Sequence, residues 1–256
     1  MPGIIISGID GRMGKALRAL IAEDPAFETF EVVAGFDLFN GEIDGIPVFS
    51  SPESSADTVP DADVVVDFSN YAFVGGVLRF CEAMRTPAVI ATTALGDLEI
   101  EIMHETAKQT AVFHSANMSL GVNLVAKMSG LAAPALEDGF NIEIIETHHN
   151  KKKDAPSGTA ILLADAINAS LKDRKEYVYG RYGREEAPSL SEIGIHAVRG
   201  GSVPGRHTVM FAGPDEMIEI THTVYSNKVF AAGALKAAGF IIGKAPGLYD
   251  MNDLLA

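Results

Sequence analysis

Short apolar runs alternate with amphipathic segments through the first half of the chain. The continuous apolar runs, rich in Val, Ile and Ala, predict buried strands at 3–7, 31–37, 63–69, 87–93 and 111–114. Between the runs, apolar residues recur at spacings of three and four, as in Met13, Leu17, Leu20 and Ile21, and predict helices. The segments 72–84 and 98–109 are further predicted helices, and 40–60 is expected to be an irregular connection. Strands that alternate with helices predict an α/β fold with a Rossmann-type, doubly wound parallel sheet.

The pattern changes after Asn123. Helices are expected at 124–136 and 160–171, strands at 142–145 and 193–199, and a hairpin from the runs 208–212 and 217–224. The segment 173–188, with Arg174, Arg181 and Arg184, is expected to be polar and turn-like. These elements predict a second, α+β domain with a mixed sheet and long helices on one face. A last helix, from Val229 to about Gly243, is expected to pack back on the first domain.

Composition narrows the class of protein. A formal net charge of −14 and a pI near 4.8 disfavour nucleic-acid binding. No apolar stretch reaches the ~20 residues that a membrane-spanning helix needs, and no signal peptide is apparent at the start. The lone cysteine, Cys81, lies in an apolar helical run and is expected to be a buried structural thiol. A cytoplasmic location fits these features.

A glycine turn follows the first predicted strand and opens the first predicted helix. Gly8, Gly11 and Gly14 form a G-x-x-G-x-x-G pattern, and this position between strand and helix favours dinucleotide binding. The alternative is a tight turn that needs glycine only for its backbone. Asp37 ends the second strand near the ~20-residue offset at which an acid takes the adenosine ribose hydroxyls. Its carboxylate should repel a 2′-phosphate, so NADH is the expected cofactor, while Arg12 leaves NADPH open.

A basic block lies where a strand is expected to end and a helix to begin. His148, His149 and Lys151 to Lys153 reverse the local sign of charge in an acidic protein, which favours an anionic ligand. Ser157, Gly158 and Thr159 follow, and amides at a helix start bind carboxylates. Histidine, lysine and amides together favour a site for an anion that receives a proton. The alternative is a solvated basic loop. No metal site is expected, because the paired histidines lack a Cys or acid at ligand spacing.

The chain resembles the dihydrodipicolinate reductase (4-hydroxy-tetrahydrodipicolinate reductase) family of diaminopimelate and lysine biosynthesis. The resemblance covers essentially the whole chain. It is carried by Gly8 to Gly14, Asp67-Phe68-Ser69, Ala91-Thr92-Thr93, Asn117 to Asn123, Glu146 to Ala160 and Ile218 to His222. Three positions depart from the family pattern: Ala91 replaces the usual glycine, Met118 a common aromatic residue, and Leu38 an arginine of members that use both cofactors.

The resemblance implies specific roles. Cofactor contacts are expected from Gly8, Ile9, Asp10, Gly11, Arg12, Met13, Asp37, Ala91, Thr92, Thr93, Ser115, Ala116, Asn117 and Met118. His148 and Lys152 are expected to act in proton transfer, and His149, Ser157, Gly158 and Thr159 to hold the carboxylates of a small dicarboxylate substrate. Residues 1–119 with 229–256 would form the dinucleotide-binding domain. Residues 120–228 would form a substrate-binding domain that assembles a homotetramer through its sheet.

The expected reaction is reduction of 4-hydroxy-tetrahydrodipicolinate to tetrahydrodipicolinate by hydride from NAD(P)H. The sequence leaves open whether His148 or Lys152 delivers the proton. One rival hypothesis is an aspartate-type NAD-dependent dehydrogenase of the same architecture. Another is a non-catalytic NAD-sensing regulator, which would need no proton donor. The complete block from Lys152 to Thr159 speaks against both. Arg199, followed by two glycines, is a further candidate for an anion contact.

Overall fold

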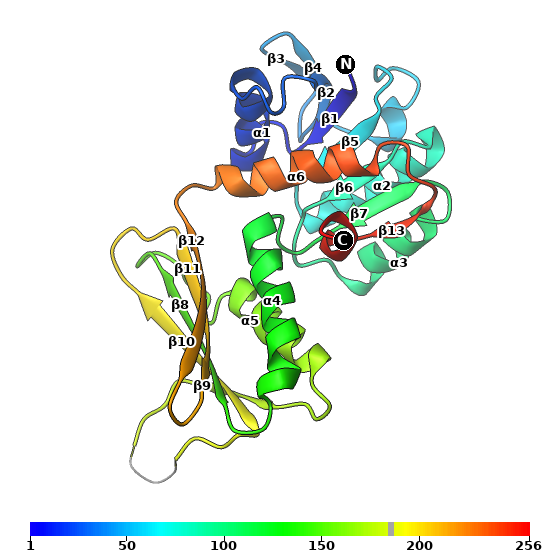
Figure 1. Ribbon diagram of the computed structural model, residues 1–256. Coiled ribbons are helices and arrows are strands. Elements are labelled where there is room, and N and C mark those ends of the chain that lie inside the picture. Colours follow the sequence, from blue (N-terminus) through cyan, green and yellow to red (C-terminus); the bar gives the residue numbers. More distant parts are fainter. Residues whose placement is uncertain (184–186) are drawn as a thin grey trace. The chain divides into compact units, whose positions relative to one another are not determined.

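The computed structural model describes residues 1–183 and 187–256, so the predicted turn residue Arg184 lies outside the described part. The chain forms two compact units (Figure 1). The first contains Met1–Ser119 and Asn227–Ala256, and the second contains Leu120–Ser226. Among the described residues, no helix combines the length and apolar character that crossing a membrane requires.

The first unit is built on an eight-stranded sheet in the order β13-β7-β6-β5-β1-β2-β4-β3. The strands are β1 (Gly3–Ser7), β2 (Glu31–Phe36), β3 (Gly41–Ile43), β4 (Ile46–Phe49), β5 (Val64–Asp67), β6 (Ala88–Ile90), β7 (Ala111–His114) and β13 (Gly247–Tyr249). All neighbouring pairs are parallel except β3 with β4. The expectation of an irregular segment at 40–60 was therefore wrong in part: turn residues at Asp44 and Gly45, both at positive φ, close a short hairpin there.

Helices cover this sheet. They are α1 (Arg12–Glu23), α2 (Tyr71–Met84), α3 (Asp97–Thr106), α6 (Lys228–Ile241) and the short α7 (Met251–Leu254), with a 3-10 turn, η1, at Glu53–Ser55. The helix predicted after Val229 is α6, which packs beside α1 and against β5, β6 and β7, so its return to the first unit is confirmed.

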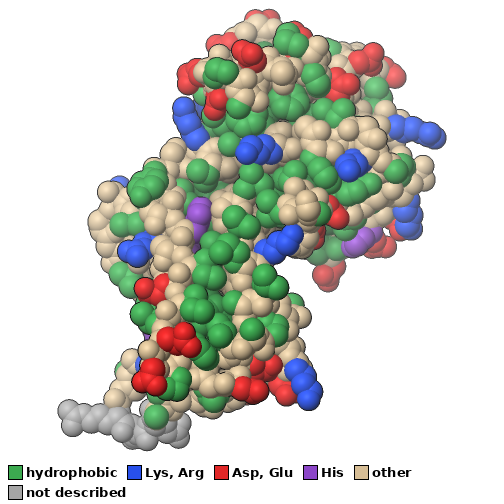
Figure 2. All heavy atoms as spheres, viewed as in Figure 1, with side chains coloured by type: hydrophobic (Ala, Val, Ile, Leu, Met, Phe, Trp, Pro, Cys, Tyr) green, Lys and Arg blue, Asp and Glu red, His purple; other side chains and the backbone are tan. Residues whose placement is uncertain are grey.

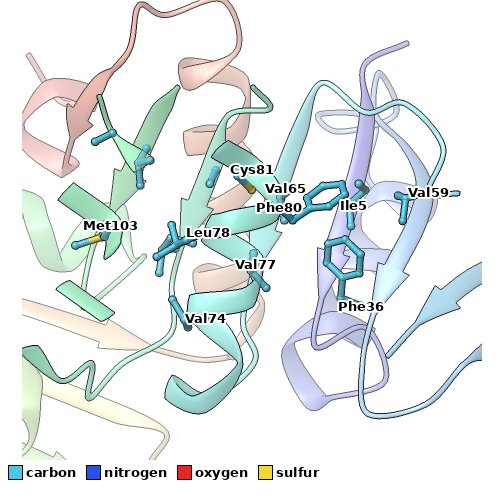
Figure 3. Close-up of a cluster of buried hydrophobic side chains, with 14 of the residues drawn as sticks. Ile5, Phe36, Val59, Val65, Val74, Val77, Leu78, Phe80, Cys81 and Met103 are labelled. Carbon is cyan, nitrogen blue, oxygen red and sulfur yellow. The ribbon is translucent and has the colours of Figure 1, made fainter. Parts of the chain in front are cut away.

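One hydrophobic core lies between the sheet and the α2–α3 layer (Figure 3). Phe36 of β2 and Phe80 of α2 meet edge to face with centroids 5.0 Å apart. Cys81 is fully buried in this core, and burial raises the pKa of its thiol far above the usual value. The expected structural thiol is confirmed. Because strand side chains alternate, Ile4 and Ile6 point to the opposite face from Ile5, where they are buried as well.

The second unit is built on a five-stranded sheet in the order β12-β11-β8-β10-β9. Its elements are α4 (Leu120–Leu136), β8 (Asn141–His148), α5 (Gly158–Ser170), β9 (Glu176–Tyr179), β10 (Glu192–Arg199), β11 (Gly205–Ala212) and β12 (Met217–Val224). The antiparallel β11–β12 hairpin confirms the prediction. Two expectations were wrong. Strand β8 continues through His148, three residues past the predicted end at Ile145, and the 173–188 segment contains β9, which pairs with β10.

The two helices of this unit lie together on one side of the sheet (Figure 1). Residues of β8 alternate strictly: Ile142, Ile144, Glu146 and His148 are buried, while those between them are partly exposed. Ile142 and Ile144 belong to the core formed with α4 and α5. Glu146 and His148 therefore point to the helix-covered face. The space-filling view shows a strip of hydrophobic side chains along α4 (Figure 2). On this helix Leu124, Met128 and Leu131 are exposed.

Candidate active site

The glycine turn of the first unit needs its glycines for close packing. Gly8 has φ 76°, and a Cβ there would lie 2.9 Å from the carbonyl oxygen of Phe68, at the end of β5. A Cβ on Gly14 would lie 2.3 Å from the carbonyl oxygen of Gly8, so this glycine lets α1 start directly against the turn. The turn thus lies between β1 and β5, where the strand order reverses. Ligands of open α/β sheets bind at such a switch point.

A pocket of about 160 Å³ opens at this switch point. Its lining consists of Gly8, Gly11, Asp37, Leu38, Phe68, Ser69, Asn70 and Phe73. The carboxylate of Asp37 accepts hydrogen bonds from the backbone N–H groups of Asp10 (2.9 Å) and Leu38 (2.8 Å). Asp37 therefore lies beside the glycine turn, and none of the described residues that line this pocket is cationic. The geometry fits a dinucleotide whose ribose carries free hydroxyls.

A buried carboxyl group, Asp67, joins this pocket to the ends of two neighbouring strands. Its oxygens accept hydrogen bonds from the hydroxyls of Ser69 and Thr92, and its backbone carbonyl accepts from the N–H of Ala91. Burial raises the pKa of Asp67, which these hydroxyl donors partly offset. Asp67 thus fixes the positions of Ala91 and Thr92, two of the expected nicotinamide contacts.

The remaining predicted cofactor residues, Ser115 to Met118, form a turn after β7. The hydroxyl of Ser115 donates to the carbonyl oxygen of Asn117 (2.9 Å), and the amide oxygen of Asn117 accepts from the N–H of Ser119 (2.9 Å). Met118 is 2 % exposed, because α6 approaches so closely that a Cβ on Gly233 would lie 1.7 Å from the Met118 carbonyl oxygen. Burial of Met118 gives its side chain a packing role within this unit.

The second unit brings the other predicted residues to one end of its sheet. His148 ends β8, and the register places Arg199 of β10 beside it. His207 of β11 pairs with Glu146 of β8 on one side and with His222 of β12 on the other. Four of the five strands thus contribute a polar side chain to the same end of the helix-covered face.

Glu146 is the centre of this cluster and is completely buried. Its Oε2 accepts from Nδ1 of His148 (2.6 Å) and from Nη1 of Arg199 (2.7 Å). Its Oε1 accepts from Nη2 of Arg199 (2.7 Å) and from the N–H of Ser157 (3.0 Å). Burial raises the pKa of Glu146, but the Arg199 guanidinium, His148 and the Ser157 amide outweigh burial and hold the pKa below its usual value. The group is therefore a carboxylate.

Arg199 is occupied within this cluster. Besides its two hydrogen bonds to Glu146, its guanidinium donates to the carbonyl oxygens of Asp154 (2.7 Å) and Val198 (2.8 Å). The hypothesis that Arg199 contacts a ligand anion is therefore not supported by its geometry. The sequence of β10 could have predicted the contact between Arg199 and Glu146. Side chains alternate between the two faces of a strand, and Arg199 lies an even number of residues from the buried Ile193 and Ile195, on the same face.

The start of α5 is held by Ser157, which is the N-cap residue. Its hydroxyl accepts from the N–H of Ala160 (3.2 Å) and lies 2.8 Å from Nε2 of His207. Since Ser157 is only 2 % exposed, its side chain supports the helix start, while its expected contact with substrate stays a prediction. Gly158 is exposed, and a Cβ there would meet open space. A carboxylate has room to approach the backbone at this position.

Lys152 lies in the turn between β8 and α5. Its ammonium group forms an ion pair with Asp154 (2.7 Å), and its backbone N–H donates to the carbonyl oxygen of His149 (3.1 Å). The hydrogen bond from Lys152 lowers the pKa of Asp154. Lys151 and Lys153 are exposed. Asp154, which sequence reasoning assigned no role, therefore positions the predicted catalytic lysine.

Two further histidines, His207 and His222, belong to the cluster. His207 is 3 % exposed, and burial, with a smaller contribution from the neighbouring His148, lowers its pKa to about 4. Burial also lowers the pKa of His222, whose ring lies against the start of α4, where a Cβ on Gly121 would be 2.5 Å away. His148 and His207 meet edge to face at 5.1 Å. The lowered pKa values leave His207 and His222 neutral near pH 7.

Comparison with known proteins identifies the family to which the chain belongs. The family described as "Dihydrodipicolinate reductase, N-terminus" matches residues 3–118, and "Dihydrodipicolinate reductase, C-terminus" matches residues 121–255. The chain belongs to the dihydrodipicolinate reductase family.

Individual relatives agree. The chain is 49 % identical over 252 residues to 4-hydroxy-tetrahydrodipicolinate reductase of Caldanaerobacter subterraneus subsp. tengcongensis, covering 98 % of this chain and 97 % of that protein. Identity to the protein of the same name from Clostridium botulinum is 43 % over 253 residues, with 98 % and 97 % covered. Dipicolinate-bound dihydrodipicolinate reductase from Paenisporosarcina sp. TG-14 superimposes with a TM-score of 0.82 at 25 % identity, covering 98 % and 99 %.

These matches confirm the family, the α/β fold class and the oxidoreductase class that the sequence suggested. The chain also resembles aspartate dehydrogenase from Thermotoga maritima, with a TM-score of 0.53 at 13 % identity and 96 % and 98 % covered. At this identity the likeness shows a shared fold alone, so the rival aspartate-type activity gains no support from it.

Proposed function

We propose that this chain reduces 4-hydroxy-tetrahydrodipicolinate to tetrahydrodipicolinate with hydride from NAD(P)H, a step of lysine biosynthesis through diaminopimelate. The observation that carries this proposal is the cluster in which Glu146, Arg199 and the start of α5 hold His148 beside an accessible helix N-terminus. Proteins named for this reaction match the chain over nearly its whole length. A solved relative named as dipicolinate-bound supports a planar dicarboxylate as the ligand class.

The first unit fits a nicotinamide dinucleotide. The glycine turn lies at the strand switch point, and the pocket there is lined by Gly8, Gly11 and Asp37. Gly8 to Met13 would hold the pyrophosphate, and Asp37 the ribose hydroxyls. Ala91 to Thr93 and Ser115 to Met118 would line the nicotinamide side. When bound, the reduced nicotinamide supplies the hydride.

The second unit supplies charge and a proton. Loss of one water, which takes the 4-hydroxyl of the substrate, gives a ring with a conjugated C=C–C=N system. Hydride that adds to this system leaves negative charge on the ring, and one proton must follow to give tetrahydrodipicolinate. His148 and Lys152 serve this proton transfer, and the ammonium group of Lys152 stabilises the developing anion. His149 and the backbone of Gly158 and Thr159 hold the two carboxylates. Proton transfer of this kind contributes a factor of roughly 10²–10⁴ to the rate.

The experiment that tests the reaction follows loss of reduced-nicotinamide absorbance with freshly generated 4-hydroxy-tetrahydrodipicolinate. Wild-type protein is expected to oxidise the cofactor, and Lys152→Ala to lose about 10²–10⁴-fold in kcat. Lys172→Ala, an exposed lysine outside the cluster, is the matched control and should keep full activity. A folded wild-type protein that binds NADH but oxidises none of it would refute the proposal and favour the sensing regulator.

NADH is the proposed preferred cofactor. Asp37 would repel a 2′-phosphate, and the neighbouring Leu38 is 79 % exposed without a charge to attract one. Leu38→Arg should therefore raise kcat/KM for NADPH by roughly tenfold or more, since a charge-assisted hydrogen bond contributes about 1.5–3 kcal/mol. Leu98→Arg, also exposed in the first unit, is the control. Equal use of both cofactors by the wild type would overturn this preference.

A cytoplasmic homotetramer is the proposed assembly. The face of the five-stranded sheet away from α4 and α5 carries Ile145, Thr147, Val198 and Met210, and Val198 is 46 % exposed. A sheet face of this kind, on which apolar side chains lie among the partly exposed Glu143, His196 and Arg181, suits contact with a second copy. Light scattering of Val198→Asp should show dissociation. If Leu131→Asp on α4 dissociates the assembly instead, the strip along α4 is the interface.

A further inference from the structure

One carboxylate organises most of the predicted catalytic and substrate-binding residues. Glu146 accepts four hydrogen bonds: two from Arg199, one from His148 and one from the amide of Ser157. These donors come from β10, from β8 itself and from the start of α5. Arg199 reaches further, to the carbonyl oxygen of Asp154, whose side chain holds Lys152. The two residues thus connect His148, Lys152 and the helix start.

The contact with Glu146 also fixes which nitrogen of His148 can react. An ionised carboxylate only accepts hydrogen bonds, so Nδ1 of His148 must carry a proton. The Nε2 atom is then the nitrogen free to exchange a proton with a ligand. A Cβ at position 205 would lie 3.1 Å from this Nε2, so the glycine there spares the ring a close contact.

We propose that Glu146 and Arg199 are positioning residues for the reaction: Glu146 fixes His148 in the tautomer with the proton on Nδ1, and Arg199 anchors the segment from Asp154 to the start of α5 onto the same carboxylate. This inference rests on the proposed function. Neither residue need touch the substrate, because both terminal nitrogens of the guanidinium donate within the cluster and Glu146 has no exposed surface. The pairing of a carboxylate with a catalytic imidazole is a general way of setting its orientation.

The chain contains a matched control on the same strand. Glu143 of β8 also binds a histidine, at 2.6 Å from Nε2 of His196, and an arginine, at 2.8 Å from Nη2 of Arg181. It has the opposite parity in β8 and lies on the other face of the sheet. Glu143→Gln therefore makes the same chemical change as Glu146→Gln, away from the cluster.

The test is nitrogen-15 NMR of the imidazole rings in wild type, Glu146→Gln and Glu143→Gln, with His148→Asn to assign the signals. In the wild-type protein, the neutral form of the His148 ring is expected to carry its proton on Nδ1. In Glu146→Gln the tautomer should become mixed, and kcat should fall at least tenfold, toward the ~10²–10⁴-fold limit of proton transfer, with KM for NADH unchanged. Glu143→Gln should change neither. An unaltered His148 tautomer and kcat in folded Glu146→Gln would overturn the proposal.

A second variant covers the outcome in which Glu146→Gln does not fold. Arg199→Lys keeps the charge but loses the two-pronged hydrogen bond. Here the His148 tautomer should persist, while the dissociation constant for dipicolinate, measured by calorimetry, should rise by about tenfold as the start of α5 loosens. Unchanged dipicolinate binding would overturn the anchoring role. Because the tautomer and dipicolinate binding are read without turnover, failure of the reductase assay in wild type would be distinguished from failure of this inference.

Discussion

Strand β8 contributes a glutamate to each of two sets of Glu, His and Arg residues, one set on each face of the sheet. On the helix-covered face Glu146 binds His148 and Arg199, and on the other face Glu143 binds His196 and Arg181. The side chain of Glu146 is 0 % exposed and that of Glu143 is 16 % exposed. Glu146 also accepts a hydrogen bond from the backbone N–H of Ser157, at the start of the next helix. In the other set, Arg181 instead donates to a second carboxylate, that of Glu192.

The same three residue types therefore do different things according to the face on which they lie. The set around Glu146 ties a strand end to a helix start and leaves one histidine nitrogen available. The set around Glu143 ties neighbouring strands through partly solvated ion pairs, which stabilise little individually. Burial and connection, rather than the identity of the residues, distinguish the candidate catalytic cluster.

The largest difference is expected when each arginine is removed. Arg199→Ala leaves Glu146 as a buried carboxylate without its main partner, so the free energy of unfolding should fall by roughly 3–5 kcal/mol. Arg181→Ala should cost about 1 kcal/mol or less, because Glu143 and Glu192 can be hydrated. Urea unfolding followed by circular dichroism measures both. Equal losses would mean that the two ion pairs are energetically alike, contrary to their difference in burial.

A pH experiment sharpens the comparison through His207, which pairs with Glu146 and contacts His148 on the helix-covered face. Its pKa is lowered from 6.5 to about 4, so between these values the unfolded chain binds a proton that the folded protein does not. The stability that comes from keeping His207 neutral is fully present above pH 6.5 and is lost as the pH falls toward about 4. At that pH the loss in the free energy of unfolding reaches up to about 3 kcal/mol.

Urea unfolding between pH 7 and pH 4 should accordingly show a steeper loss of stability in wild type than in His207→Gln. His196→Gln, which alters the histidine on the other face, should retain the wild-type slope. If His207→Gln has the same pH dependence as wild type, another group is responsible for the acid lability.

The sequence predicted the periodic parts of this molecule well. The apolar runs gave the strands of the Rossmann-type sheet and the hairpin of the second unit, because burial on both faces or on one face leaves a direct pattern. It missed β9 and the β3–β4 hairpin, which are short and pair at sheet edges where the hydrophobic pattern is weak. The end of β8 was placed too early because Glu146 and His148 are polar residues in buried positions.

The candidate site was predicted as a set of residues but not as a structure. His148, Lys152 and Gly158 were assigned from their types, from their order in the chain and from the resemblance to a known family. Their partners could not be, since Arg199 lies far from Glu146 in sequence and its role depends on strand register. The contact of His207 with Ser157 likewise depends on the pairing between β8 and β11.

The smallest expected effect concerns Gly194 of β10, which makes room for the second set. A Cβ at this position would lie 1.8 Å from Oε2 of Glu143, so Gly194→Ala must push this carboxylate away from His196 and Arg181. The displaced atoms are the end of a flexible side chain, and the free energy of unfolding should fall by only about 1 kcal/mol. Gly200→Ala, where a Cβ meets open space, is the control for stability and should change it by less than ~0.5 kcal/mol. Because the Glu146 set lies on the other face of β8, kcat of Gly194→Ala should equal that of wild type in the reductase assay. A loss of kcat without unfolding would show that the two faces are coupled through β8, and the separation drawn between the two sets would then fail.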